Sequence, residues 1–287
     1  MKPVKLIAMD MDGTLLTNRR ISPANMAALR SAVDAGIEIA LASGRLPDDI
    51  SFWAKDVGLP FHVISLNGNC LLDGPFGKPI ENHFMPTESA LYIHQLALES
   101  GLMHAIFRWD ELAISWIQPP EDLEHWGSHL RRNGGRQALR FGQAAGDRLI
   151  RRGCNKIVII DHSGDPSKLN KIRDLVRANC PDIEITASGA TNIELNRVGI
   201  TKGTALTTLA AHLGIPMSQV MALGDSDNDL PMIQAAGYGV AMGNANAVVK
   251  AAARYETLHH AQDGVAAAIR ALALHDPNVI LPRISEI

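Results

Sequence analysis

The stretch VKLIAMDMDGTLL, residues 4–16, decides the fold of this chain. Residues 4–9 form a short apolar run, as expected for a strand that is buried on both faces of a parallel sheet. Asp10 and Asp12 follow directly, and a glycine and a threonine come next. Because open α/β sheets bind their ligands at the carboxyl ends of the strands, we expect both acids to lie at that edge.

Strand and helix patterns alternate along both ends of the chain. Ser22 and Pro23 predict the start of a helix that ends near Gly36. Strands are expected at residues 37–41, 62–66, 220–223 and 238–241, helices at 23–35, 46–57, 201–213, 228–235 and 245–253, and a hairpin after the turn at 67–69. This alternation predicts an α/β fold with a doubly wound, Rossmann-like parallel-sheet core.

The sequence between these two parts has a different texture. It carries three of the four tryptophans and several loop-like segments. Helices are expected at residues 87–100, 121–132 and 167–179, and strands at 103–107, 112–117, 156–160 and 183–186. We therefore expect a catalytic core made of residues 1–85 and 189–287, with an α+β cap of residues 86–188 inserted into it.

A second acidic segment, GDSDND at residues 224–229, follows the strand expected at 220–223. If its loop lies beside the first one, up to five carboxylates converge, and their repulsion is costly in a partly desolvated site. A hard divalent cation resolves this repulsion. Oxygen ligands with no histidine or cysteine nearby favour Mg²⁺ over zinc.

The segment that starts at Asp10 also resembles the beginning of an EF-hand calcium loop. That loop needs a further acceptor at its fifth position and a glutamate at its twelfth. The sequence has Thr14 and Ile21 there, so the calcium interpretation fails.

Two further segments predict phosphate binding. LASGR, residues 41–45, places the Ser43 hydroxyl and the Gly44 amide after the second strand. Lys202 lies at a helix start, where the helix dipole also favours an anion. A carboxylate nucleophile, a second carboxylic acid, Mg²⁺, a hydroxyl and a lysine are together sufficient for phosphoryl transfer.

These motifs resemble the haloacid dehalogenase-like phosphatase superfamily, and the match is close to its Cof-type sugar-phosphatase branch. The resemblance covers nearly the whole chain, through DMDGTLL, LASGR, the Asn67-Gly68-Asn69 turn, GITKG, GDSDNDLPMIQAAGYGVAMGNA and the closing TLHHAQDGVAAAI. The family often has threonine where Ser43 stands and alanine where Asn69 stands. The first difference is conservative because serine and threonine both offer one hydroxyl, and the second changes the expected chemistry little.

The resemblance implies a role for each matching residue. Asp10 would be the nucleophile that becomes an aspartyl-phosphate, and Asp12 the acid and then the base. The phosphoryl group would be held by Ser43, Gly44, Lys202 and Asn228, and the metal by Asp10, the backbone carbonyl of Asp12, Asp225 and, through its water shell, Asp229. Asp227 occupies a variable position and is interpreted as a loop residue.

The function that follows is a Mg²⁺-dependent phosphatase acting on a small phosphorylated metabolite such as a sugar phosphate. Two alternatives stay open: a phosphomutase or phosphotransferase on the same scaffold, and a catalytically silent binding protein. A receiver-like signalling domain would fit the core but would leave the cap unexplained. Arg45 is as consistent with a structural ion pair as with phosphate binding.

Composition bounds the partners and the compartment. A formal net charge of −3 gives no reason to expect nucleic acid or a membrane as a partner, and no obligate protein partner is evident. Three widely spaced cysteines and the absence of a signal-peptide pattern predict a cytoplasmic protein. A basic bias over residues 131–156 is interpreted as a solvated face, and the adjacent His259 and His260 as loop residues. The sequence assigns no role to the 273–287 tail.

Overall fold

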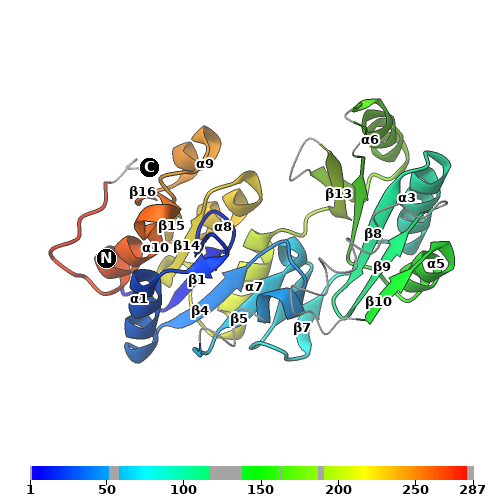
Figure 1. Cartoon of the computed structure of the whole chain (residues 1–287). Coiled ribbons are helices and arrows are strands. Elements are labelled where there is room, and N and C mark those ends of the chain that lie inside the picture. The colour runs from blue at the N-terminus through cyan, green and yellow to red at the C-terminus, as the bar shows by residue number, and fades with distance from the viewer. Residues whose placement is uncertain are drawn as a thin grey trace. The chain divides into compact units, whose positions relative to one another are not determined.

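The computed structural model describes residues 2–51, 58–116, 138–161, 163, 165–186 and 191–282. The chain divides into two compact units (Figure 1). One contains Met1–Arg45, Trp53–Ile80 and Thr201–Ile287, and the other contains Leu46–Phe52 and Glu81–Ile200. The first unit carries the segments that the sequence assigns to chemistry.

The first unit is built around one large sheet. Among the described residues the sheet has the strand order β16-β15-β14-β1-β4-β5-β6-β7. The strands are β1 (Leu6–Asp10), β4 (Glu38–Ala42), β5 (His62–Ser65), β6 (Cys70–Leu72), β7 (Pro79–Asn82), β14 (Val220–Gly224), β15 (Tyr238–Ala241) and β16 (Tyr255–Glu256). A separate short hairpin joins β2 (Leu16–Thr17) to β3 (Arg20–Ile21).

Strand β1 lies at the centre of this sheet and all five of its residues are buried. It runs parallel to β14 on one side, with Leu6 opposite Val220, and parallel to β4 on the other, with Leu6 opposite Glu38. Because the three strands are parallel and paired residue by residue, their carboxyl ends lie at the same edge of the sheet. That edge receives Asp10 and the loops that follow β4 and β14.

Helices cover both faces of the sheet (Figure 1). They are α1 (Pro23–Asp34), α7 (Lys202–His212), α8 (Leu230–Ala235), α9 (Ala247–Ala252) and α10 (Gly264–Ala268), with shorter turns at Leu66–Gly68, Met217–Gln219, Asp227–Asp229 and His260–Gln262 and a π-helical turn at Ile269–Ala273. Helix α7 packs Leu206 and Leu209 on the face of the sheet that carries Leu6. Helices α1 and α10 contact each other.

The caps of α1 and α7 follow from their sequences. The Ser22 side chain accepts a hydrogen bond from the Asn25 amide, and a proline occupies the first turn of α1. At α7, Thr201 accepts from the Thr204 amide while the Thr204 hydroxyl accepts from the Thr201 amide. This reciprocal capping fixes where α7 begins, and hence where Lys202 lies.

The second unit is an α+β domain with its own core. Its sheet has the order β10-β9-β8-β11-β13-β12 among the described residues. The elements are β8 (Met103–Arg108), β9 (Glu111–Ser115), β10 (Ala138–Phe141), β11 (Lys156–Ile160), β12 (Ile183–Thr186), β13 (Asn192–Arg197), α3 (Thr87–Glu99), α5 (Gln143–Arg151) and α6 (Ser167–Asn179). Residues of all three helices pack with Ile106, Ile157 and Ile193 of the sheet into one buried cluster.

The described structure confirms the α/β fold class and the segments expected to form the core strands, α1 and α7. The β2–β3 hairpin, β10, α5, β13 and α10 were not predicted. Residues 47–51 are helical, whereas the rest of the helix expected at 46–57 and the helix expected at 121–132 lie outside the described residues. The second unit runs to Ile200 and includes β13, while the sequence-based boundaries at 85/86 and 188/189 stay a prediction.

Candidate active site

Asp10 ends β1 and is buried at the carboxyl edge of the sheet. Its Oδ1 accepts a hydrogen bond from Lys202 Nζ at 2.5 Å. The same ammonium donates to Oδ1 of Asp229 at 2.6 Å, and no part of the Lys202 side chain is exposed. Lys202 therefore bridges the strand that carries Asp10 and the loop that carries Asp229.

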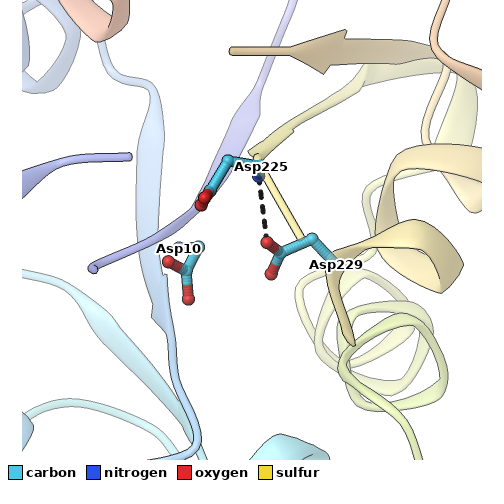
Figure 2. A group of neighbouring side chains, drawn as sticks. All are labelled: Asp10, Asp225 and Asp229. Atoms are coloured by element: carbon cyan, nitrogen blue, oxygen red, sulfur yellow. Dashed lines mark hydrogen bonds between the residues drawn. The ribbon is translucent and has the colours of Figure 1, made fainter. Parts of the chain in front are cut away.

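Asp229 also organises the loop after β14. Its Oδ2 accepts from the backbone N–H groups of Asp225 at 3.0 Å and Ser226 at 3.1 Å. Figure 2 shows the carboxylates of Asp10, Asp225 and Asp229 gathered at one place, with the Asp225 amide donating to Asp229. One oxygen from each of the three lies within 4.8 Å of the others.

The electrostatics of this group are dominated by burial. Burial raises the pKa of Asp10 to about 7, with Asp229 and Asp225 acting in the same direction and Lys202 against it. Burial and the charge of Asp229 also raise the pKa of Asp225. Burial alone would lower the pKa of Lys202, but the two carboxylates outweigh it and raise that pKa. Among the described residues, three carboxylates lie around one ammonium, so ionisation of all three leaves a net negative charge at this place.

Gly13 explains how the two acidic loops come together. Its φ is +85°, and a Cβ at this position would lie 2.6 Å from Oδ2 of Asp225. A side chain would therefore clash with a carboxylate as well as strain the backbone. The Thr14 hydroxyl donates to Asp225 Oδ1 at 3.1 Å and completes the contact between the loops.

Ser43 and Arg45 belong to the loop after β4. Ser43 is buried, and its Oγ accepts from the Arg45 amide at 3.2 Å. The Arg45 side chain turns to the exposed Asp12, with Nε 2.8 Å from Oδ2 and Nη2 2.7 Å from Oδ1. The two acids of the DMD motif thus have different environments, because Asp10 is buried against Lys202 and Asp12 is held at the surface.

The turn after β5 supports this loop. Asn67 has a left-handed backbone, with φ of +57°, and its side-chain oxygen accepts from Asn228 Nδ2 at 3.2 Å. A Cβ on Gly44 would lie 3.0 Å from that oxygen. At Gly68, with φ of +102°, a Cβ would lie 2.2 Å from the Thr201 carbonyl oxygen. The turn is therefore packed directly against the start of α7.

The structure gathers four of the predicted site residues into one cluster and places others in neighbouring loops. Asp10, Asp225, Asp229 and Lys202 converge. Ser43 and Gly44 lie in the loop after the adjacent strand, while Asn228 is exposed and reaches Asn67. Asp227 is exposed and its Oδ1 accepts from Asn246 Nδ2 at 2.8 Å. The catalytic and binding roles of these residues stay predictions.

Sequence reasoning missed a supporting contact from the C-terminal segment. Asn244 Nδ2 donates to the carbonyl of Gly13 at 2.8 Å, and Asn244 Oδ1 accepts from the His260 amide at 2.9 Å. The His260 ring lies 3.2 Å from the Thr17 hydroxyl of the β2–β3 hairpin. The adjacent histidines did not indicate this contact, but Asn244 in the MGNA segment is a polar residue in the loop that follows β15.

The basic bias over 131–156 is partly described. Arg131, Arg132 and Arg136 lie outside the described residues. Of the others, Arg140 and Arg152 both pair with Glu111, and Lys156 pairs with Glu194. Three of the five described basic residues of this segment thus form ion pairs within the second unit.

A family model described as haloacid dehalogenase-like hydrolase matches residues 7–269. The chain belongs to the haloacid dehalogenase-like hydrolase family. A 5-amino-6-(5-phospho-D-ribitylamino)uracil phosphatase of Bacillus subtilis is 33% identical to it over 277 residues, which cover 93% of this chain and 95% of that one. A pyridoxal phosphate phosphatase of Escherichia coli is 29% identical over 272 residues, 91% of this chain and 96% of that one.

A solved haloacid dehalogenase-like hydrolase from Bacteroides thetaiotaomicron shares the fold, with a TM-score of 0.80, 30% identity and coverage of 93% of this chain and 99% of that one. These similarities confirm the resemblance to the family and its Cof-type branch. Because its relatives are phosphatases, this haloacid dehalogenase-like hydrolase is a phosphoric monoester hydrolase. No helix within the described ranges is long and apolar enough to cross a membrane.

Proposed function

We propose that this phosphatase hydrolyses a small phosphate monoester with Mg²⁺, through an aspartyl-phosphate formed on Asp10. The observation that carries the proposal is the 2.5 Å contact between Lys202 Nζ and one oxygen of the buried Asp10. A carboxylate fixed by one oxygen presents its other oxygen in a defined direction, which favours attack on phosphorus.

The donor set fits Mg²⁺. Asp10, Asp225 and Asp229 offer only oxygen ligands. Burial, together with repulsion from Asp229, raises the pKa of Asp10 and Asp225, and a bound cation would stabilise their charged forms. Asp10, Asp225 and the backbone carbonyl of Asp12 would hold the ion, and Asp229 would support its water shell. When bound, the ion would neutralise negative charge on the phosphoryl oxygens.

The two half-reactions use Asp10 and Asp12 in turn. Attack by Asp10 forms an oxygen–phosphorus bond as the bond to the leaving group breaks, and Asp12 protonates the leaving oxygen. Water then attacks the phosphorus of the aspartyl-phosphate while Asp12 accepts a water proton. Asp10 is released together with inorganic phosphate. Ser43, Gly44, Lys202 and Asn228 would hold the phosphoryl oxygens during both steps.

The leaving group would be a small metabolite, selected by the second unit acting as a cap. The relatives named for 5-amino-6-(5-phospho-D-ribitylamino)uracil and for pyridoxal phosphate support this size class and indicate which compounds to assay.

The test is a phosphate-release screen with Mg²⁺ over these two compounds and a set of hexose, pentose and polyol monophosphates. We expect free inorganic phosphate from at least one compound, with the dephosphorylated metabolite as the other product. An isomerised phosphate ester would instead identify a phosphomutase. Absence of turnover across the whole set, with bound monophosphate detected by calorimetry, would identify a silent binding protein.

A further inference from the structure

The ion pair between Arg45 and Asp12 holds the expected acid and base of the reaction at the surface. Both carboxylate oxygens of Asp12 accept hydrogen bonds from the guanidinium, at 2.8 and 2.7 Å. Two parallel bonds fix the orientation of the carboxylate as well as its position. If the Asp12 carboxylate turns away from Arg45 toward a leaving oxygen or a water molecule, at least one of these two bonds breaks.

Hydrogen bonds hold the backbone of Arg45 in place, so any change of partner has to come from its side chain. The Arg45 amide donates to Ser43 Oγ at 3.2 Å, and its carbonyl accepts from the Leu66 amide at 3.0 Å. The side chain of Arg45 is 22% exposed and that of Asp12 is 56% exposed. Because more than half of the Asp12 side chain is exposed, water can solvate its carboxylate when the guanidinium leaves, which lowers the cost of opening the pair.

Lys202, the cation that contacts Asp10, is fixed in place. Lys202 is fully buried and donates to two carboxylates at once. Breaking either bond would leave an uncompensated charge in the interior, which is strongly unfavourable. Within this pair of cations, a change of partner on substrate binding therefore falls to Arg45.

We propose that Arg45 exchanges partners during the catalytic cycle, from Asp12 in the empty enzyme to the phosphoryl group in the substrate complex. A guanidinium offers the same fork of two donors to phosphate as to carboxylate. In the chain, Arg45 directly follows Ser43 and Gly44, which are the residues of the loop after β4 that are expected to bind phosphate. The exchange couples arrival of a phosphate ester to release of Asp12, so the acid becomes available when there is a substrate to protonate.

This inference rests on the proposed function, but its test does not need turnover. The affinity for inorganic phosphate is measured by calorimetry at saturating Mg²⁺ in four proteins: the natural sequence, Arg45→Ala, Asp12→Asn and the double variant. If Asp12 competes with phosphate for Arg45, then Asp12→Asn tightens phosphate binding by about two- to fivefold when Arg45 is present. In the Arg45→Ala background the same substitution should increase phosphate affinity less, because no guanidinium remains for which Asp12 and phosphate compete.

If the ion pair is permanent, Asp12→Asn should increase phosphate affinity more in the Arg45→Ala background than in the natural one. Arg45 would then neutralise Asp12 at all times, so Asp12→Asn would change phosphate affinity little in the natural background. In the Arg45→Ala background the bare carboxylate would repel phosphate, and Asp12→Asn would give the larger gain. A larger increase in phosphate affinity in the Arg45→Ala background, or equal increases in the two backgrounds, would overturn the exchange.

Steady-state kinetics on a compound found in the screen give a second readout. Exchange predicts that Arg45→Ala raises KM by about tenfold or more, because a contact to the phosphoryl group is lost. A residue that only orients Asp12 would lower kcat and leave KM unchanged, and that result would also overturn the proposal. Arg45→Gln replaces Arg45→Ala if the latter does not fold. Arg30→Ala, at an exposed position of α1, is the matched control and should leave phosphate affinity unchanged.

The two proposals can fail separately. If no compound is turned over, but Asp12→Asn increases phosphate affinity more when Arg45 is present, the proposed function fails and the exchange stands. If a monoester is hydrolysed but the order of gains is reversed, the exchange fails and the proposed function stands.

Discussion

Lys202 Nζ lies 2.5 Å from Oδ1 of Asp10, and neither side chain has more than a small part of its surface in solvent. The residues are 192 positions apart in the chain. One cation therefore orients the expected nucleophile and compensates part of its charge in a buried site.

Asp10→Asn should remove turnover. An amide cannot attack phosphorus to form an acyl phosphate and is a poorer metal ligand. We expect a fall in kcat/KM of about three decades or more, or at least about 4 kcal/mol of transition-state stabilisation. Asp227→Asn, which removes a charge from the exposed part of the 224–229 loop, is the control and should keep most of the activity. An Asp10→Asn variant with a tenth of the natural activity would refute the nucleophile assignment.

Removal of divalent metal should abolish activity, and added Mg²⁺ should restore it. Mn²⁺ should substitute for Mg²⁺, whereas Ca²⁺ should support little turnover because it prefers more ligands at longer distances. Phosphate release is measured after dialysis against chelator and again after each ion is added back. Undiminished activity in excess chelator would contradict the proposed metal dependence.

Asp12→Asn should slow both half-reactions, because one residue serves first as acid and then as base. The backbone carbonyl survives the substitution, so Mg²⁺ affinity should change little. Single-turnover kinetics and metal titration separate the two effects. Loss of Mg²⁺ binding with unimpaired chemistry is the outcome that would reassign Asp12.

Gly68→Ala should disturb the site from outside it. The new Cβ would meet the Thr201 carbonyl at 2.2 Å and would sit on a backbone with φ of +102°. The start of α7 must then shift, and Lys202 with it. We expect destabilisation by more than about 2 kcal/mol and a large loss of kcat.

Gly36→Ala is the matched control for this variant. Gly36 has φ of +77°, but a Cβ added there would have no neighbouring atom within 4 Å. Alanine at this position should therefore cost about 1–2 kcal/mol from backbone strain alone. Thermal melts and kcat are compared for both variants. Equal losses at the two positions would show that the contact with Thr201 is unimportant.

The buried histidines of the second unit predict an acid-sensitive stability. His94 Nδ1 lies 2.6 Å from His104 Nε2, and burial lowers the pKa of His104 to about 3. The unfolded chain binds this proton near pH 6.5 and the folded chain does not. Stability is therefore lost as pH falls from about 6.5 towards 3, with a limiting slope of about 1.4 kcal/mol per pH unit.

His104→Asn should reduce this slope, because the amide can donate to the Leu102 carbonyl but does not titrate. Urea unfolding at several pH values between 4 and 7 measures it. His275→Gln, at an exposed position, controls for the loss of a histidine. If the His104→Asn variant keeps the full acid slope, the slope comes from other groups.

Much of the first unit could be predicted because its signals are local. The apolar run before Asp10, the Ser22 cap and the Thr201 cap each specify an element within a few residues. The order of strands and loops then places both acidic segments at one edge of a parallel sheet. The positions of the loops predicted that up to five carboxylates converge, whereas three do so in the described structure, because Asp12 and Asp227 are exposed.

What could not be predicted depends on tertiary contacts between side chains. Nothing in the sequence indicates that Asp12 turns to Arg45 while Asp10 turns to Lys202, since this is decided by burial and rotamer. The link from His260 through Asn244 to Gly13 joins segments more than 200 residues apart. Strand β13 alternates polar and apolar residues, and its place beside β11 is set by long-range pairing.

The central position of β1 has a consequence for synthesis of the protein. The Thr14 hydroxyl and the Asp225 carboxylate that it contacts are separated by 211 residues. At ribosomal rates of about 5–20 residues per second, the second acidic loop emerges roughly 10–40 s after the first. The nascent chain thus carries its nucleophile strand, and has room to fold the intervening α+β unit, well before β14 exists to pair with β1. The catalytic centre is completed late in translation, and the emerging polypeptide is inactive until then.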